Sequence, residues 1–164
     1  MEVKGREVDG DIDPMALLTA ASSVYMSLKC GLALADLLGK NRLGWQKATT
    51  RLRNTIARKP HLFNMTKSRF SMDWFYPVLT GALTGPAARD RIDLHWRKFV
   101  VKDQGVRCVS DRPWITMAET SELVLALNAM GRRVPAEILF SWIQDKAYGD
   151  GAYWCGHTFP DMTI

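Results

Sequence analysis

The sequence predicts an all-α fold made of three αα-hairpins, and three observations lead to this prediction. Helix-capping residues and prolines divide the chain into six helical segments, almost no segment alternates as a strand would, and similar connecting segments return about every 40 residues. With 164 residues, 47% of them hydrophobic and 24% charged, the chain suits one soluble globular domain with a sizeable core.

The first hairpin is expected over about residues 14–58. Asp13 can cap its first helix, with Pro14 in the first turn, where the missing N–H costs nothing. Gly39 is suited to end this helix, because glycine readily adopts the left-handed conformation found at many helix C-termini. The second helix is expected over residues 45–58, before a proline stops it.

The second hairpin is expected over about residues 72–100. Ser71 can cap its first helix, within which Pro77 would produce a kink. Pro86 lies in the first turn of the following helix, where proline is favoured, and this helix is expected to extend to about Val100.

The third hairpin is expected over about residues 117–146. Thr116 and Glu119 have the spacing of a capping box, in which each side chain bonds a free backbone N–H of the other residue. Gly131 would end the first helix of this hairpin, and Pro135 would open the second, which reaches about Lys146.

The segments that follow the hairpins resemble one another. They read "KPHLFNMTKSRFSMDW", "VKDQGVRCVSDRPWITMAE" and, over the C-terminal connector 147–164, "AYGDGAYWCGHTFPDMTI". Each contains polar turn residues and an aromatic residue, and Phe70, Trp114 and Trp154 recur roughly 40 to 44 positions apart. This period indicates a helical array, in which each unit buries its apolar face against its neighbours.

The segment "QDKAYGDGAYW" resembles, with altered spacing, the Q-x(2-5)-G-x-W repeat motif of the terpenoid cyclase and protein prenyltransferase superfamily. Gln144, Gly151 and Trp154 take the matching positions. The stretches "KSRFSMDWFYPVLTGAL" and "VRCVSDRPWITMAETSELVLAL" followed by "DGAYWCG" are similar to bacterial prenyltransferase-like proteins, and the resemblance spans about residues 14–161.

This resemblance implies an α/α toroid in which inner and outer helices alternate, the first, third and fifth being inner. Three hairpins would form about half of such a ring, so the chain is expected to be a fragment or a half that needs a partner. The resemblance further implies a cytoplasmic, transferase-like or cyclase-like protein that holds an isoprenoid or similar apolar substrate in the concave pocket.

The decisive catalytic motifs of that superfamily are missing, because the chain contains neither a D-x-D-D nor a D-D-x-x-D sequence. Two other functions therefore remain open. One is a carbohydrate-active (α/α) barrel, a glycosidase or lyase that uses paired carboxylates and aromatic platforms. The other is a non-catalytic helical-repeat module that binds a partner on its surface.

Three carboxylates are the candidate catalytic residues. Asp73 stands at the start of an expected inner helix, where the helix dipole favours a negative charge. Glu122 lies on a largely apolar helix, so that an inward orientation would perturb its pKa. Asp161 lies in the C-terminal connector. The capping box already accounts for Glu119.

Substrate contacts are expected from side chains that can line an apolar pocket or stack against a sugar: Trp74, Tyr76, Trp114, Tyr153, Trp154 and His157. Zinc requires three or four converging ligands, and Cys155, His157 and Asp161 are crowded on one short loop, so no metal site is predicted. The sequence identifies no cofactor.

The net charge of +5 is unevenly distributed, since nine Lys or Arg residues and no Asp or Glu lie between Lys40 and Met72. Lys47, Arg51 and Arg58 would form a basic stripe on one helix, which could contact a membrane surface peripherally. Nucleic acid is not expected as a partner, because aromatic residues are not interleaved with the basic ones.

The N-terminus contains no secretory signal, and the three cysteines are far apart, which favours a cytoplasmic location with reduced thiols. The richest apolar stretch is interrupted by serines and a lysine, so it is expected to be a buried helix and not a membrane span. The open edges of the helical array would expose apolar faces and favour self-association.

Overall fold

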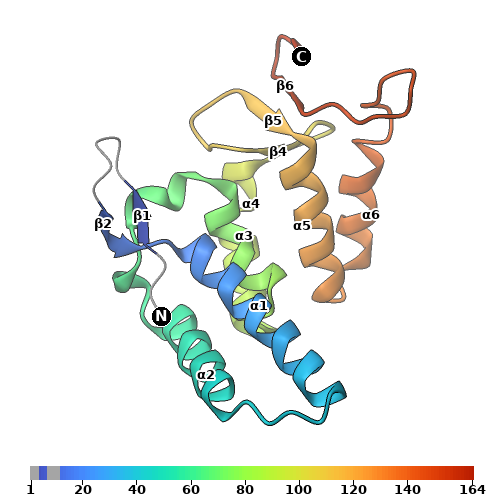
Figure 1. Cartoon of the computed structure of the whole chain (residues 1–164). Coiled ribbons are helices and arrows are strands. Elements are labelled where there is room, and N and C mark those ends of the chain that lie inside the picture. The colour runs from blue at the N-terminus through green and yellow to red at the C-terminus, as the bar shows by residue number, and fades with distance from the viewer. Residues whose placement is uncertain (1–3, 7–11) are drawn as a thin grey trace.

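The computed structural model describes residues 4–6 and 12–164 and is mostly helical (Figure 1). Within that part of the chain the helices are α1 (Leu18–Leu37), α2 (Leu43–Arg58), α3 (Ser71–Leu79), α4 (Gly85–Phe99), α5 (Met117–Ala129) and α6 (Arg133–Ser141). The short strands are β1 (Lys4–Arg6), β2 (Ile12–Ala16), β3 (Val100–Val101), β4 (Gly105–Arg107), β5 (Trp114–Thr116) and β6 (Gly156–Thr158). Two 3-10 turns, η1 (Pro60–Leu62) and η2 (Met65–Arg69), join α2 to α3.

The six helices pair as the sequence predicts. Helices α2, α4 and α6 each pack against the helix that precedes them, while α3 packs between α1 and α5 (Figure 1). The odd-numbered helices therefore form a continuous row. The N-termini of α1, α3 and α5 point to the same side of the molecule, and the segments that lead into these helices gather there.

The all-α expectation holds only in part, because the connecting segments form two small antiparallel sheets. Strands β1 and β2 form one, and β3, β4, β5 and β6 form the other in that order. Each strand in the second sheet has only two or three residues, too few for an alternating pattern to be recognised in the sequence. The larger sheet ties the segment before α5 to the C-terminal connector.

The predicted glycine stops of α1 and α5 are confirmed. Gly39 and Gly131 have φ values of 64° and 74°, in the left-handed region. The residue after each glycine closes the helix end: the Lys40 N–H donates to the Ala35 carbonyl at 2.8 Å, and the Arg132 N–H donates to the Leu127 carbonyl at 2.9 Å. These bonds satisfy carbonyls that have no partner within the helix.

Three predicted helix caps differ in the structure. Ser71 is the first residue of α3 and its hydroxyl donates to the Cys108 carbonyl, so it does not cap that helix. Asp13 and Pro14 lie in β2, and α1 begins only at Leu18, because pairing with β1 keeps this backbone extended. The capping box before α5 does not form, since the Thr116 hydroxyl donates to the Glu119 carboxylate and neither side chain caps the helix backbone. This carboxylate therefore has a different environment from the one predicted.

Helix α6 ends at Ser141, earlier than the expected end at Lys146. Beyond it the backbone makes bonds over three residues, such as the Ile143 N–H to the Phe140 carbonyl at 3.2 Å and the Lys146 N–H to the Ile143 carbonyl at 3.1 Å. This tighter winding turns the chain towards the C-terminal connector.

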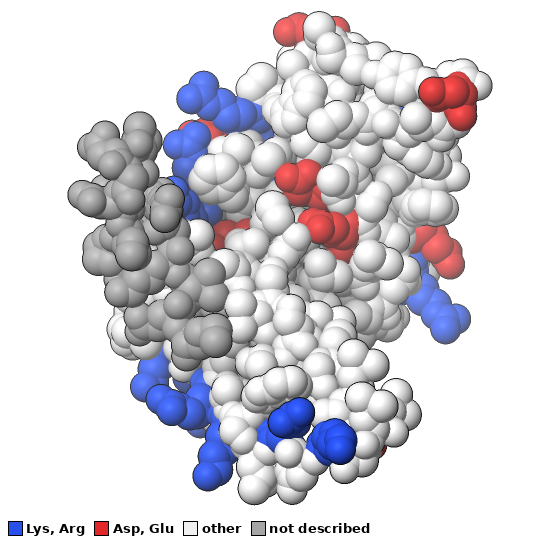
Figure 2. All heavy atoms as spheres, viewed as in Figure 1, with Lys and Arg blue, Asp and Glu red and all other residues white. Residues whose placement is uncertain are grey.

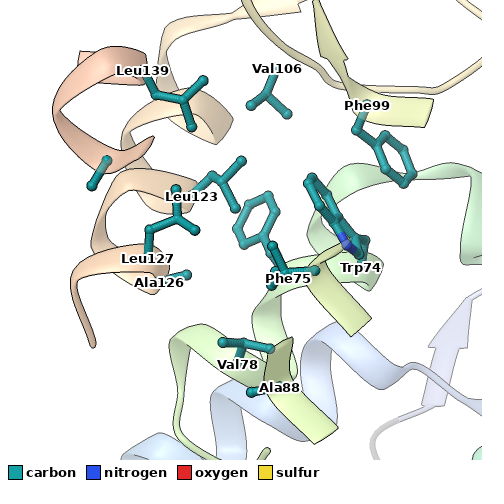
Figure 3. Packing of buried hydrophobic residues seen from close by; sticks show 12 residues of the cluster. Trp74, Phe75, Val78, Ala88, Phe99, Val106, Leu123, Ala126, Leu127 and Leu139 are labelled. Carbon is teal, nitrogen blue, oxygen red and sulfur yellow. The ribbon is translucent and has the colours of Figure 1, made fainter. Parts of the chain in front are cut away.

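The main core joins α3, α4, α5, α6 and β4 (Figure 3). The indole of Trp74 stacks on Phe99 with ring centroids 5.1 Å apart and an interplanar angle of 14°. The indole N–H donates to the Arg91 carbonyl at 2.9 Å, so the one polar atom of this ring is satisfied. Phe75 points from the same helix towards Leu123 of α5 (Figure 3).

Helix α1, with 20 residues, is long and apolar enough to cross a bilayer, and the mean hydropathy of an 18-residue window within it is 1.2. The core helix of a soluble protein meets the same criterion. In this structure α1 packs against α2 and α3 and buries Leu18, Ala21 and Tyr25, but only 28% of its apolar window is buried, so the expectation of a buried helix holds only in part.

We predict that Gly156→Ala destabilises the protein by about 1–3 kcal/mol, because a methyl group at this position of β6 would overlap the carbonyl oxygen of Ile115 and press on the Trp114 ring. Urea unfolding would measure the change. Gly149→Ala is the matched control, since a methyl group there meets no atom within 4 Å. Equal stability of the two variants would contradict the tight pairing of β5 and β6.

Candidate functional site

Acidic side chains gather in the middle of the face shown in Figure 2, over α3 and α5, with uncharged surface around them. Asp73 lies in the first turn of α3 and Glu119 in the first turn of α5, and Glu122 follows one turn later. Both helix N-termini favour negative charge. Because α3 packs against α5, the starts of two neighbouring helices both carry carboxylates.

Glu122 and Tyr76 connect the two helices across this surface. The Tyr76 hydroxyl donates to Glu122 Oε1 at 2.8 Å. Burial raises the pKa of Glu122, the Tyr76 hydrogen bond opposes that effect, and the nearby charge of Glu119 adds to it. Burial and the bond to Glu122 raise the pKa of Tyr76, so this phenol remains protonated and continues to donate.

Glu119 is nearly buried, with 9% of its surface exposed, and is held by two neighbours. The Thr116 hydroxyl donates to its Oε2 atom. The Cys108 thiol also interacts with this carboxylate; burial, followed by the hydrogen bond to Glu119, raises the pKa of Cys108 to about 11. The thiol is therefore a neutral donor, and it lies in the segment between β4 and β5 that leads to α5.

Asp73 is 7% exposed and lies beside Arg91 of α4. Burial raises the pKa of Asp73, and the attraction of Arg91 and a hydrogen bond with Thr19 partly offset that rise. The guanidinium also bonds the backbone of α3, donating to the Asp73 carbonyl at 2.8 Å and to the Trp74 carbonyl at 2.7 Å. Arg91 thus holds this helix turn in place and partly offsets the effect of burial on the pKa of Asp73.

The Arg91 contact replaces a bond that the sequence of α3 removes. Pro77 lies inside this helix and has no N–H to donate to the carbonyl of Asp73, four residues earlier. The Arg91 guanidinium donates to that carbonyl instead. The Asp73 carbonyl, which the proline leaves without a donor in its own helix, therefore links α3 to α4 through Arg91.

This arrangement is suited to proton transfer. Glu122 is a carboxyl group with a raised pKa, so it keeps its proton to higher pH than an exposed glutamate. Glu119 lies one turn before Glu122 on the same helix, and Asp73 supplies a further carboxyl group in the first turn of the neighbouring helix. A protonated carboxyl group near a second carboxylate is the arrangement used to cleave glycosidic bonds.

The structure separates the remaining sequence-predicted residues from this cluster. Trp74 is 2% exposed and packs in the core, so its ring does not reach the acidic surface. The half-buried Trp114 lies against Gly156 between β5 and β6. Tyr153 and Trp154 line a groove of about 440 Å³ between α5, α6 and the C-terminal connector. Asp161 is exposed on that connector, beyond β6.

His157 is fully buried in β6, with its Nε2 atom 3.0 Å from the amide oxygen of Gln104. Burial, and then the charge of Lys146, lower its pKa. Cys155, two residues earlier, is exposed. In the part of the chain that the structure describes, no three His, Cys, Asp or Glu side chains converge as metal ligands would.

Sequence reasoning missed the groups that hold the carboxylates in place. Arg91, Thr19 and Cys108 come from other helices or from a connector, and no local pattern links them to Asp73 or Glu119. The pairing of Glu119 with Glu122 did have a signal, because residues three apart share one face of a helix. Because Glu119 was assigned to a capping box, it was not grouped with Glu122.

No family model matches the chain. A search of curated proteins, however, finds a relative that matches 146 residues, or 89% of this chain, at 50% identity. The relative is a mannosidase. Its full name is MMP endo-(1,4)-3-O-methyl-alpha-D-mannosidase, from Mycolicibacterium hassiacum, and the matched part of this chain spans 40% of its length.

This relative corrects the expected kinship with terpenoid cyclases and prenyltransferases, which is wrong, as are the transferase and cyclase activities inferred from it. The similarity instead favours the alternative of a carbohydrate-active protein that uses paired carboxylates. The resemblance depended on a connector that contains aromatic residues and glycine, and this connector is a turn that follows a helix. Proteins with unrelated chemistry share such features of the scaffold.

We predict that Glu122→Gln makes the protein more stable than the wild type at pH 7. Burial raises the pKa of Glu122, so the folded protein binds this proton more tightly than the unfolded chain, whose ordinary value is 4.5. The stabilising effect of the proton is complete below that pH and is lost as the group ionises. The advantage of the variant should therefore disappear below about pH 4.5.

Urea titrations from pH 3 to pH 8 would measure this difference in the free energy of unfolding, the range covering about one and a half units or more on each side of the glutamate's ordinary value. Glu137→Gln on the exposed side of α6 is the matched control, since it removes the same charge away from the cluster. A Glu122→Gln variant that is less stable than the wild type at pH 7 would contradict the raised pKa.

Proposed function

We propose that this chain contributes the acid-bearing wall of a glycosidase active site, and that the substrate is a (1,4)-linked α-mannoside with 3-O-methyl groups. The observation that carries the proposal is the Glu122 carboxyl group, whose raised pKa and hydrogen bond to Tyr76 suit a proton donor. The similarity to a mannosidase supports the choice of substrate.

We further propose that α1, α3 and α5 are inner helices of an α/α toroid and that α2, α4 and α6 are outer ones. The continuous packing of α1, α3 and α5 supports this arrangement, as does the pairing of each with the helix that follows it. In such a ring the substrate lies in the concave middle, near the ends of the inner helices. Asp73, Glu119 and Glu122 occupy the first turns of two of these helices or follow directly after.

In the proposed reaction Glu122 acts as the general acid. It donates its proton to the glycosidic oxygen as the bond from that oxygen to the anomeric carbon breaks. Water provides the hydroxyl group that forms the new bond to the anomeric carbon. If water attacks directly, a second carboxylate receives the proton that this water gives up; if that carboxylate first forms a glycosyl intermediate, the proton returns to Glu122 and the second carboxylate is released when its bond to the anomeric carbon breaks. Glu122 and the second carboxylate thus end with one proton between them, as they began.

Asp73 is the proposed second carboxylate, because it lies on the neighbouring helix. Burial raises the pKa of Asp73, and the attraction of Arg91 partly offsets that rise and so favours the ionised form. Glu119 has a supporting role, in which its charge raises the pKa of Glu122. Asp161, on the C-terminal connector, is a further candidate for contact with the sugar from the rim. Tyr76 is a positioning residue, since it orients Glu122 and stabilises its ionised form.

The test is incubation of the full chain with (1,4)-linked 3-O-methyl-α-manno-oligosaccharides, followed by mass spectrometry of the products. The proposal predicts shorter oligosaccharides with a new reducing end. Binding that perturbs the NMR signals of α3 and α5 without cleavage would support a carbohydrate-binding module instead. Neither cleavage nor perturbation of these helices would overturn the assignment of this surface to a sugar.

We predict that Glu122→Gln lowers kcat/KM for this substrate by about 100-fold to 10,000-fold, because the amide has no proton to give to the leaving oxygen. Asp73→Asn should reduce kcat by a comparable factor if it is the second carboxylate. Glu137→Gln is again the control and should retain wild-type activity. Full activity of the Glu122 variant would exclude it as the acid.

We predict that Tyr76→Phe shifts the loss of activity at high pH to a still higher pH. The Tyr76 hydroxyl stabilises the ionised form of Glu122, so its removal raises the pKa of that carboxyl group further. The acid then stays protonated over a wider range. The pH profile of kcat/KM would show this shift, whereas Tyr148→Phe on the C-terminal connector should leave the profile unchanged. A shift to lower pH would contradict the assigned roles.

A further inference from the structure

The groove between α5 and α6 is an apolar surface without a covering element among the described residues. We call it the α5–α6 groove, and it is lined by Met117, Ser121, Phe140, Ile143, Tyr153 and Trp154. Its volume is about 440 Å³, and half of the Phe140 side chain is exposed. Ala118 of α5 also lines the groove and lies one helical turn before Glu122, so the groove adjoins the acidic surface on that helix.

A second apolar surface lies at the other end of the row of helices. We call it the α1–α2 edge, and its lining residues include Val24, Leu28, Gly31, Leu34, Leu38 and Trp45. Leu34 is 60% exposed and Leu38 is 72% exposed. The opposite side of α1 faces α3, where the Lys29 ammonium group donates to the Thr80 carbonyl at 3.3 Å.

The two surfaces are equivalent places in one repeating interface. Helix α3 packs against α1 on one side and against α5 on the other. The α1–α2 edge is the side of α1 turned away from α3, and the α5–α6 groove is the corresponding free side of the last pair. An α1 helix placed beside α5 would therefore continue the packing that already joins α1, α3 and α5.

The charges at the two surfaces are complementary. Lys40 and Arg42 lie at the α1–α2 edge, and Lys47 and Arg51 follow on α2, all of them exposed. Around the α5–α6 groove, the segment that follows α6 carries exposed Asp145, Asp150 and Asp161. Its one lysine, Lys146, is nearly buried and paired with Asp145 at 3.0 Å. Figure 2 shows basic side chains towards α2 and acidic ones towards the C-terminal connector.

We propose that a second copy of this chain binds head to tail, with the α1–α2 edge of one copy seated in the α5–α6 groove of the other. Continuity with the α1–α3–α5 packing supplies the apolar contact, and opposite charges favour this pairing over contact between two like surfaces. Such an interface is heterologous, so each copy keeps one free surface for a further copy or for closing a ring. This inference does not depend on the proposed glycosidase activity.

Sedimentation velocity of the full chain over a range of concentrations tests the proposal. The wild type should associate beyond the monomer, and more weakly at high salt, because opposite charges contribute to the contact. Leu34→Ser on the edge and Phe140→Ser in the groove should each weaken association about ten-fold or more, since each removes an apolar anchor. Leu94→Ser on α4 is the matched control, because Leu94 is 77% exposed and lies in neither surface.

Mixing the two variants separates head-to-tail binding from other arrangements. The intact edge of the Phe140 variant can enter the intact groove of the Leu34 variant, so the mixture should form a dimer that grows no further. Pairing of two grooves would leave the Leu34 variant fully associated, and pairing of two edges would leave the Phe140 variant so; either result overturns the proposal. Circular dichroism would verify that both variants retain their helices.

A wild type that remains monomeric throughout also overturns the proposal. Flotation with vesicles of phosphatidylcholine and phosphatidylglycerol would then assign the α1–α2 edge to a membrane surface. Lys47, Arg51 and Arg58, the basic stripe of α2, would be the residues to reverse in that case. Sedimentation tests self-association, and the oligosaccharide assay tests the acidic surface. Failure of the proposed self-association is therefore distinguishable from failure of the proposed glycosidase activity.

Discussion

The burial of one side of α3 is the constraint on which the rest of the structure depends. Trp74, Phe75 and Val78 all enter the main core and fix the rotation of this helix about its axis. The helical repeat then requires Asp73 and Tyr76 to lie on another side, where they meet groups from α1 and α5. The same apolar contacts that stabilise the fold therefore determine which polar groups face one another.

Arg91 makes this arrangement rigid where the sequence of α3 would otherwise weaken it. Pro77 leaves the Asp73 carbonyl without its usual backbone donor, and the Arg91 guanidinium supplies the replacement from α4. Burial lowers the pKa of Arg91, and the attraction of Asp73 opposes that effect. A half-buried guanidinium is tolerated here because two carbonyls and a carboxylate surround it.

Ionising the carboxyl groups of Asp73 and Glu122 costs more free energy than ionising the same groups in water. Asp73 and Glu122 have raised pKa values because burial removes water from their charged forms, and Glu119 adds repulsion at Glu122. Hydrogen bonds from Tyr76 and Thr116 orient two of these carboxyl groups without neutralising them. Groups that are held in place and yet destabilised in their charged form are characteristic of sites used for binding or catalysis.

The sequence by itself determined the six helices, their pairing and the glycine ends of α1 and α5, because apolar spacing, proline and glycine act within a few residues of one another. It also singled out Glu122 as an acid whose pKa would shift on burial. The predicted relationship to terpenoid cyclases and prenyltransferases was wrong, because the aromatic connector on which it was based reflects how the chain turns after a helix and carries no information on the chemistry of the site. Only the tertiary structure decided the small sheet, the Tyr76 bond to Glu122 and the support from Arg91, because each joins residues from separate elements whose meeting depends on how the helices pack.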